Sequence, residues 1–153
     1  MPEQRQIDFY HLKDKELATP VAMLAHKSVG IGQKMLILSA DEHMDAVSDA
    51  LWASSRESFL AHGRNDEKGA DTAPVWLCSD VAANPNKASY VCLTSGLVPP
   101  DPEVFQRIFM LFDGTRETAI AFARSCWKDW SCLDGVQCCY FVQDDAGLWV
   151  KRR

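Results

Sequence analysis

The sequence predicts a three-layer α/β fold, with a mostly parallel sheet and helices on both of its faces. Short runs rich in β-branched and aromatic residues alternate with stretches whose apolar residues recur at helical spacing. The run at 34–39 (KMLILS) does not alternate between apolar and polar residues, which is typical of a strand buried on both faces of a parallel sheet. With 153 residues and no internal repeat, residues 1–153 are expected to form a single domain.

The first strand–helix unit lies before residue 33. Residues 6–12 (QIDFYHL) have β-branched and aromatic side chains at their centre, which predicts a strand. Thr19 followed by Pro20 predicts a helix N-cap with proline at the first helical position, and residues 21–30 continue this helix. Gly30-Ile31-Gly32 ends it. A dinucleotide-binding fingerprint follows a strand and opens a helix, so this glycine pair does not match one.

The second unit begins with the buried strand at 34–39. Ser39 or Asp41 is expected to cap a helix over residues 41–53. The apolar residues of this helix fall on helical spacing: Met44, Val47, Leu51 and Trp52. Residues 54–74 are expected to be mostly loop, with one short apolar turn at Phe59-Leu60.

Two further strands are predicted in the middle of the chain, at 75–78 and 89–94, with a turn at 84–86 between them. A proline-rich connection then leads into residues 104–113. Their central apolar residues, 108–112, fit either a strand or a helix, and periodicity alone does not decide between the two.

The last part of the chain contains the longest helix and a hairpin. Residues 113–115 (DGT) are expected to cap a helix that runs to about residue 131. A turn at 134–135 follows. Residues 136–143 and 148–151 then predict the two strands of a closing hairpin.

Motifs that would carry catalysis are missing from the sequence. It has no phosphate-binding loop sequence and no G-x-S-x-G nucleophile motif. His11 lies at a strand end, where α/β enzymes bind ligands, but the sequence offers it no catalytic partner, which favours a hydrogen-bonded structural histidine. Acidic residues such as Asp41-Glu42 suit the first turn of a helix for dipole reasons alone. We therefore expect no catalytic residue, cofactor or metal; a nucleotide- or small-molecule-binding enzyme without recognisable motifs is the alternative.

Composition restricts the compartment and the partners. The net charge of −5 argues against strong direct binding to DNA, which requires a positive surface. Residues 1–11 lack the apolar segment of a signal peptide, and no apolar run approaches the length of a membrane span, so a cytoplasmic protein is expected. The six cysteines form no C-x-x-C pair and are expected to be small core residues. Cys126, beside basic residues on a helix, is the one expected to be partly reactive.

The predicted long helix has a basic face next to a tryptophan. Four residues recur at intervals of four: Arg116, Ile120, Arg124 and Lys128. Trp127 lies three residues after Arg124 and is its neighbour on the helix surface. One interpretation is a solvated basic edge with Trp127 in the core. The other is a site for an anion with an apolar group, in which Arg124 pairs with a carboxylate, Lys128 adds charge and Trp127 forms the floor. Residues 151–153 (KRR) would enlarge the positive field.

A second candidate surface involves Trp52 and Phe59. Trp52 ends a predicted helix, and Phe59 lies in a polar segment. Either one of them belongs to the core, or both are exposed together and form an apolar patch of the kind that marks an interface. The sequence does not decide between these two arrangements.

Several segments, taken in order, resemble the chi subunit of bacterial DNA polymerase III. They are residues 7–12 (IDFYHL), 34–63, 74–77 (PVWL) followed by NPN, and 111–130. The most specific pieces are D-A-L-W-x(6)-F-x-x-H at 49–62 and A-R-x-x-W-K at 123–128. The resemblance covers nearly the whole chain.

The resemblance implies a Rossmann-like domain without nucleotide and a non-catalytic adaptor between the clamp loader and single-stranded-DNA-binding protein. In this family, a basic and aromatic pocket binds the acidic, phenylalanine-ending tail of that protein. Its positions match Arg124, Trp127 and Lys128 here. Relatives can carry a further basic residue where this chain has Ile120, so that either Arg116 or the terminal basic residues substitute, or the tail binds more weakly.

The resemblance also implies a second protein interface. In the family, positions matching Trp52 and Phe59 contact the psi subunit or, alternatively, a helicase of the Rad3 type. The clamp loader itself would then be contacted indirectly.

Overall fold

The computed structural model describes residues 4–13, 16–53, 61–146 and 148–152. The strands are β1 (Arg5–Leu12), β2 (Met35–Leu38), β3 (His62–Arg64), β4 (Val75–Cys78), β5 (Tyr90–Leu93), β6 (Arg107–Asp113), β7 (Val136–Gln143) and β8 (Trp149–Lys151). The helices are α1 (Ala18–Gly30), α2 (Asp41–Ala53) and α3 (Glu117–Trp130). Two short 3-10 helices, Ala70–Thr72 and Pro102–Val104, lie in the connections.

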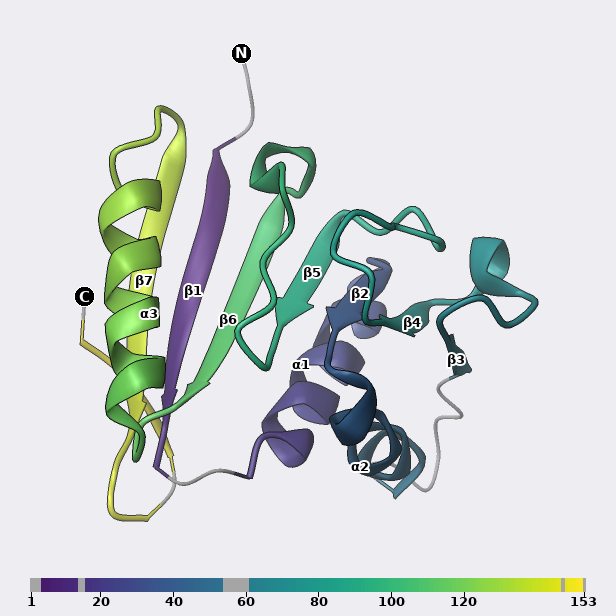
Figure 1. Cartoon of the computed structure of the whole chain (residues 1–153), viewed down its shortest axis with the longest axis horizontal. Coiled ribbons are helices and arrows are strands. Elements are labelled where there is room, and N and C mark those ends of the chain that lie inside the picture. Colours follow the sequence, from purple (N-terminus) through teal and green to yellow (C-terminus); the bar gives the residue numbers. More distant parts are fainter. Residues whose placement is uncertain (1–3, 14–15, 54–60, 147, 153) are drawn as a thin grey trace.

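Within the described residues, eight strands form one sheet in the order β3-β4-β2-β5-β6-β1-β7-β8 (Figure 1). Every neighbouring pair is parallel except the last, because β7 and β8 form an antiparallel hairpin at the sheet edge. The mostly parallel sheet predicted from the sequence is confirmed, including the closing hairpin.

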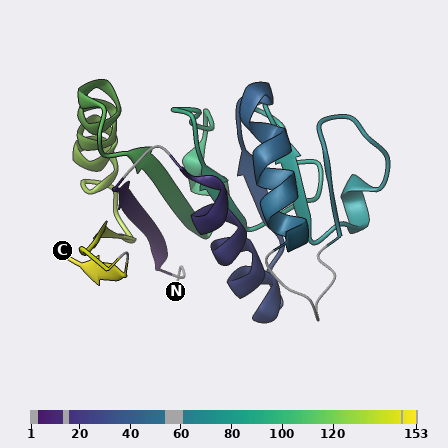
Figure 2. The ribbon, with the colours of Figure 1, turned by 90° about the horizontal axis from the view of Figure 1, so that it is seen from below.

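Helices cover both faces of this sheet. Side chains of α1 and α2 pack into one core layer, together with Tyr10 of β1. Side chains of α3 pack into the layer on the opposite face, together with Phe9. Figures 1 and 2 show α3 beside the β1–β7 end of the sheet and α2 near the β2–β4 end. The three-layer α/β architecture is therefore confirmed. None of the described helices has the length and apolarity needed to cross a membrane.

The alternation of side chains along each strand determines which layer a residue enters. Successive strand residues point to opposite faces of a sheet. In β2, all four residues are buried, with Met35 and Ile37 in the α1–α2 layer and Leu36 and Leu38 in the α3 layer. The uninterrupted apolar run at 34–39 is explained by this burial on both faces.

At α2, Asp41 is already the first helical residue and the Ser39 hydroxyl donates to the Ala40 carbonyl at 3.2 Å, so neither residue caps this helix as predicted. Two further predicted helix caps are also wrong. Helix α1 begins at Ala18, so Thr19 is already inside the helix and Leu17 is the N-cap. The carboxylate of Glu16 accepts a hydrogen bond from the Thr19 backbone N–H at 3.0 Å, and it thereby satisfies a donor that a capping side chain would otherwise engage.

The third wrong cap precedes α3. There, Arg116 is the N-cap, without a side-chain capping hydrogen bond. Asp113 instead closes a tight turn, because its carboxylate accepts from the backbone N–H of Thr115 at 2.9 Å. The DGT motif therefore ends β6 and does not start the helix.

Two segments left open or missed by the sequence are strands. Residues 108–112 lie within β6, between β5 and β1. Within the predicted loop 54–74, His62–Arg64 forms the edge strand β3 on β4. This strand carries no β-branched residue, so propensity gave no signal for it. The predicted apolar turn at Phe59-Leu60 falls on residues 54–60, which lie outside the described residues.

Candidate functional site

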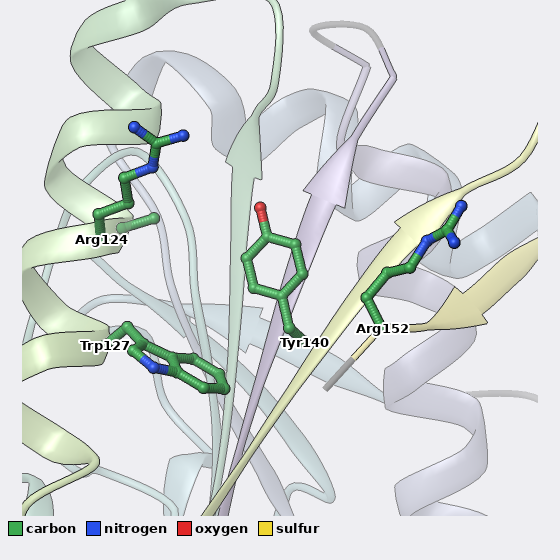
Figure 3. A pocket seen from close by; sticks show the side chains of 5 residues that line it. Arg124, Trp127, Tyr140 and Arg152 are labelled. Atoms are coloured by element: carbon green, nitrogen blue, oxygen red, sulfur yellow. The ribbon is translucent and has the colours of Figure 1, made fainter.

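A cavity of about 320 Å³ lies between helix α3 and the β7–β8 hairpin (Figure 3). Five residues line it: Ala123, Arg124, Trp127, Tyr140 and Arg152. Figure 3 shows Arg124 and Arg152 on opposite sides of the cavity, with the rings of Trp127 and Tyr140 between them. The site therefore combines two cations with two aromatic surfaces.

Helix α3 supplies one side of the cavity. Ala123 is buried against the sheet, which leaves the adjacent Arg124 on the exposed side of the helix. Trp127 is half-buried, and its ring meets Phe9 edge to face at a centroid distance of 5.2 Å. Trp127 thus belongs partly to the core and partly to the cavity wall. Which of the two interpretations describes the function of this helix face stays a prediction.

The hairpin supplies the other side. The backbone N–H of Arg152 donates to the Tyr140 carbonyl at 2.7 Å, which ties the chain beyond β8 to β7. The Tyr140 ring meets Trp127 edge to face at 6.1 Å. Residues 117–130 and 136–152 consequently contribute to one site although they belong to different elements.

His11 fixes the position of the Tyr140 side chain. The Tyr140 hydroxyl and His11 Nδ1 are hydrogen-bonded at 2.7 Å. Gly114 leaves room for this imidazole, because a Cβ at that position would overlap the His11 ring and the Leu12 carbonyl. His11 is therefore a hydrogen-bonded structural residue that orients the cavity wall.

The described lining residues of the cavity carry only positive charge. No acidic side chain is among its described lining residues. Neither Arg124 nor Arg152 forms an ion pair with another described residue. A guanidinium binds a carboxylate through two parallel hydrogen bonds, and an aromatic wall suits a ring or other apolar group. The arrangement thus fits a ligand that carries both an anionic and an apolar group.

Two of the predicted site residues lie outside the cavity lining. Lys128 is exposed on α3, one turn after Arg124. Ile120 is half-buried and packs against the core layer under α3. Sequence spacing found Arg124 and Trp127, and the basic C-terminus pointed to Arg152. No sequence pattern indicated Tyr140 as a site residue, because only the pairing of β7 with β1 brings it to α3.

The second candidate surface is only partly described. Trp52, at the end of α2, is 47% exposed, and its ring lies 4.4 Å from the His62 ring. Trp52 is therefore a surface residue, unlike Met44, Val47 and Leu51 on the same helix. Phe59 lies outside the described residues, so its distance from Trp52 stays a prediction.

The cysteines follow the core prediction in part. Cys78, Cys92, Cys126 and Cys139 are buried, Cys138 is half-buried and Cys132 is exposed. The prediction that Cys126 is reactive is contradicted. Burial, together with the nearby Asp129 carboxylate, raises the pKa of the Cys126 thiol to about 11. Among the described residues, no cluster of three or more His, Cys, Asp or Glu side chains has the arrangement of a metal site.

Comparison with known families places most of the chain within a family. A family model described as DNA polymerase III chi subunit, HolC, matches residues 5–134. The match ends just before β7, so it includes α3 but not Tyr140 or Arg152. A search of curated proteins found no significant match.

The burial of the thiols predicts their order of reaction with a disulfide reagent. In the native protein, Cys132 is expected to react fast and Cys126 slowly, since a raised pKa keeps Cys126 as the unreactive thiol at mildly alkaline pH. A spectrophotometric thiol titration measures this. Cys132→Ser should remove the fast phase, and Cys126→Ser should leave it. A fast phase that disappears only in Cys126→Ser would contradict the assignment.

Proposed function

The chain belongs to the DNA polymerase III chi subunit family, and from this premise we propose that it links the clamp-loader complex to single-stranded-DNA-binding protein. The proposed link is the acidic, phenylalanine-ending tail of that protein, bound in the cavity between α3 and the β7–β8 hairpin. The observation that carries the proposal is the pair of arginines, Arg124 and Arg152, on either side of two aromatic rings.

The chemistry of the tail matches the cavity in two respects. Its last residue offers a benzene ring and an α-carboxylate, and the preceding residues offer further carboxylates. In the proposed complex, the ring lies against Trp127 and Tyr140, and one guanidinium pairs with the terminal carboxylate. The second guanidinium then pairs with an acidic side chain of the tail. A mostly acidic protein would thus bind an acidic partner through a few positioned cations.

Arg152 is a candidate substitute for the basic residue that relatives can carry at the position of Ile120. Ile120 packs against the core and brings no charge. Arg152 reaches the cavity from the opposite side and restores a second cation. Arg116, the other candidate, is the N-cap residue of α3 and does not line the cavity. Lys128, exposed one turn beyond Arg124, would add charge for the more distant acidic residues of the tail.

In this proposal the subunit is itself non-catalytic and acts in the cytoplasm as one domain over residues 1–153. The polymerase holoenzyme performs the chemistry, and this chain contributes two binding surfaces. The first is the tail cavity. The second is the surface around Trp52 and Phe59, for the psi subunit or a helicase of the Rad3 type, through which the clamp loader is reached.

The first prediction concerns Arg124. A labelled peptide ending in Asp-Ile-Pro-Phe is expected to bind with a Kd of about 1 μM, and added salt should weaken the binding. Arg124→Ala should raise the Kd about tenfold, because a charge-assisted hydrogen bond is lost. Fluorescence anisotropy measures both effects. Arg116→Ala is the matched control and should bind like the parent protein. Equal binding by Arg124→Ala and the parent would rule out the cavity as the tail site.

The second prediction separates Arg152 from its neighbour. Arg152→Ala should raise the Kd of the same peptide about two- to fivefold, the range expected for a single exposed ion pair. Lys151→Ala removes the same charge from an exposed residue that does not line the cavity, and it should have a smaller effect. If the two substitutions weaken binding equally, Arg152 contributes only to the general positive field.

The third prediction concerns the second surface. Trp52→Ala should weaken association with the psi subunit or the Rad3-type helicase about thirtyfold, the effect of losing a buried tryptophan anchor. Binding of the tail peptide should stay unchanged. Phe122→Ala removes another exposed aromatic side chain, on α3, and serves as the control. Trp52→Ala protein that still binds both partners normally would contradict this assignment.

A further inference from the structure

A second, larger cavity lies on the opposite face of the sheet, beside helix α1. Its volume is about 600 Å³, within the range of small-molecule sites. Residues of α1, including Lys27, form one side, and Phe141 of β7 and Trp149 of β8 form the other. The tail cavity is built from the other surface of the same hairpin, because Tyr140 and Phe141 are adjacent in β7 and point to opposite faces.

Aromatic rings form much of this cavity. Tyr10 and Phe141 are stacked at a centroid distance of 4.9 Å, and Trp149 meets Tyr10 edge to face at 4.9 Å. Phe109 and Tyr90 continue the aromatic surface along β6 and β5, with their ring centroids 6.0 Å apart. These contacts hold the rings in fixed orientations, so they form a preformed apolar surface for a flat ligand.

Two cations lie at this aromatic surface. Lys27 is exposed on α1 and forms no ion pair with the described residues. Arg107 lies over the Phe109 ring at 4.9 Å. Asp8, fully buried below, accepts from Arg107 Nη2 at 2.8 Å and holds the guanidinium in place. No acidic side chain is among the described residues that line the cavity.

We propose that this cavity is a second binding site, which takes a small organic anion with an aromatic ring. The ring lies against Tyr10, Phe141 and Trp149, and the anionic group faces Lys27 and the exposed part of Arg107. A neutral ring would leave Lys27 without a counter-charge. A non-aromatic anion would leave the exposed parts of Phe141 and Trp149 in water, so the combination of both groups is what the site selects.

Ten of the twelve described residues that line this cavity lie within the matched residues 5–134. The match ends at residue 134, whereas Phe141 and Trp149 come from the hairpin that follows. The proposal is independent of tail binding, since the two cavities share no lining residue and lie on opposite faces of the sheet.

The fluorescent dye 1-anilinonaphthalene-8-sulfonate has the required chemistry, an aromatic system with one sulfonate. Its titration should be done in the Arg124→Ala/Arg152→Ala double variant, so that the tail cavity does not contribute to binding. We expect saturable binding of one dye molecule per chain. N-phenyl-1-naphthylamine, the same ring system without the sulfonate, should bind about tenfold more weakly.

Two substitutions test the location. Lys27→Glu reverses a charge at the cavity and should weaken dye binding about tenfold, whereas Lys68→Glu, the same change at an exposed residue elsewhere, should not. Trp149→Ala should also weaken it, with thermal unfolding used to verify that each variant is folded. Three results would overturn the proposal: no saturable binding, equal binding of the neutral compound, or binding that ignores both Lys27→Glu and Trp149→Ala in folded protein.

Discussion

The parallel pairing of β7 with β1 is the constraint on which the binding surfaces depend. This pairing places Tyr140 next to Phe9 in register and brings the hairpin alongside α3. The Tyr140 hydroxyl then reaches His11, and the backbone of Arg152 reaches the Tyr140 carbonyl. Without β7 in this position, Arg124 and Trp127 would form only one side of a cavity. The cavity between α3 and the hairpin therefore depends on the sheet edge as much as on the helix.

The exposure of the two arginines limits the free energy that each ion pair can contribute to binding. An isolated surface ion pair contributes about 0–1 kcal/mol, so neither arginine alone would retain a partner. Binding becomes selective when charge and an apolar surface act on the same ligand, because the aromatic contact excludes water from around the ion pair. In the proposed complex, this combination would allow a chain with a net charge of −5 to bind an acidic segment. Added salt would weaken such an interaction, because it screens exposed charges.

Local sequence patterns predicted most of the fold and half of the site. Arg124 and Trp127 could be predicted as neighbours because a helix places residues three apart on one surface. Tyr140 could not be predicted as part of the site, since its approach to α3 depends on strand pairing between residues more than a hundred positions apart. The predicted cap at Thr19 failed because α1 already begins at Ala18, and the cap at Asp113 failed because its carboxylate closes a turn at Thr115 before the helix begins. Strand β3 forms through its neighbour β4 and has no propensity of its own.

The most direct test of the account compares two forms of the tail peptide, one with a free C-terminal carboxylate and one with a C-terminal amide. The amide keeps the ring and the acidic side chains but removes the terminal charge. If a guanidinium at this cavity holds the chain end, the amide should bind about tenfold more weakly. That difference should shrink in either Arg124→Ala or Arg152→Ala, whichever removes the guanidinium that pairs with the chain end. Equal affinity of the two peptides for the parent protein would contradict the account.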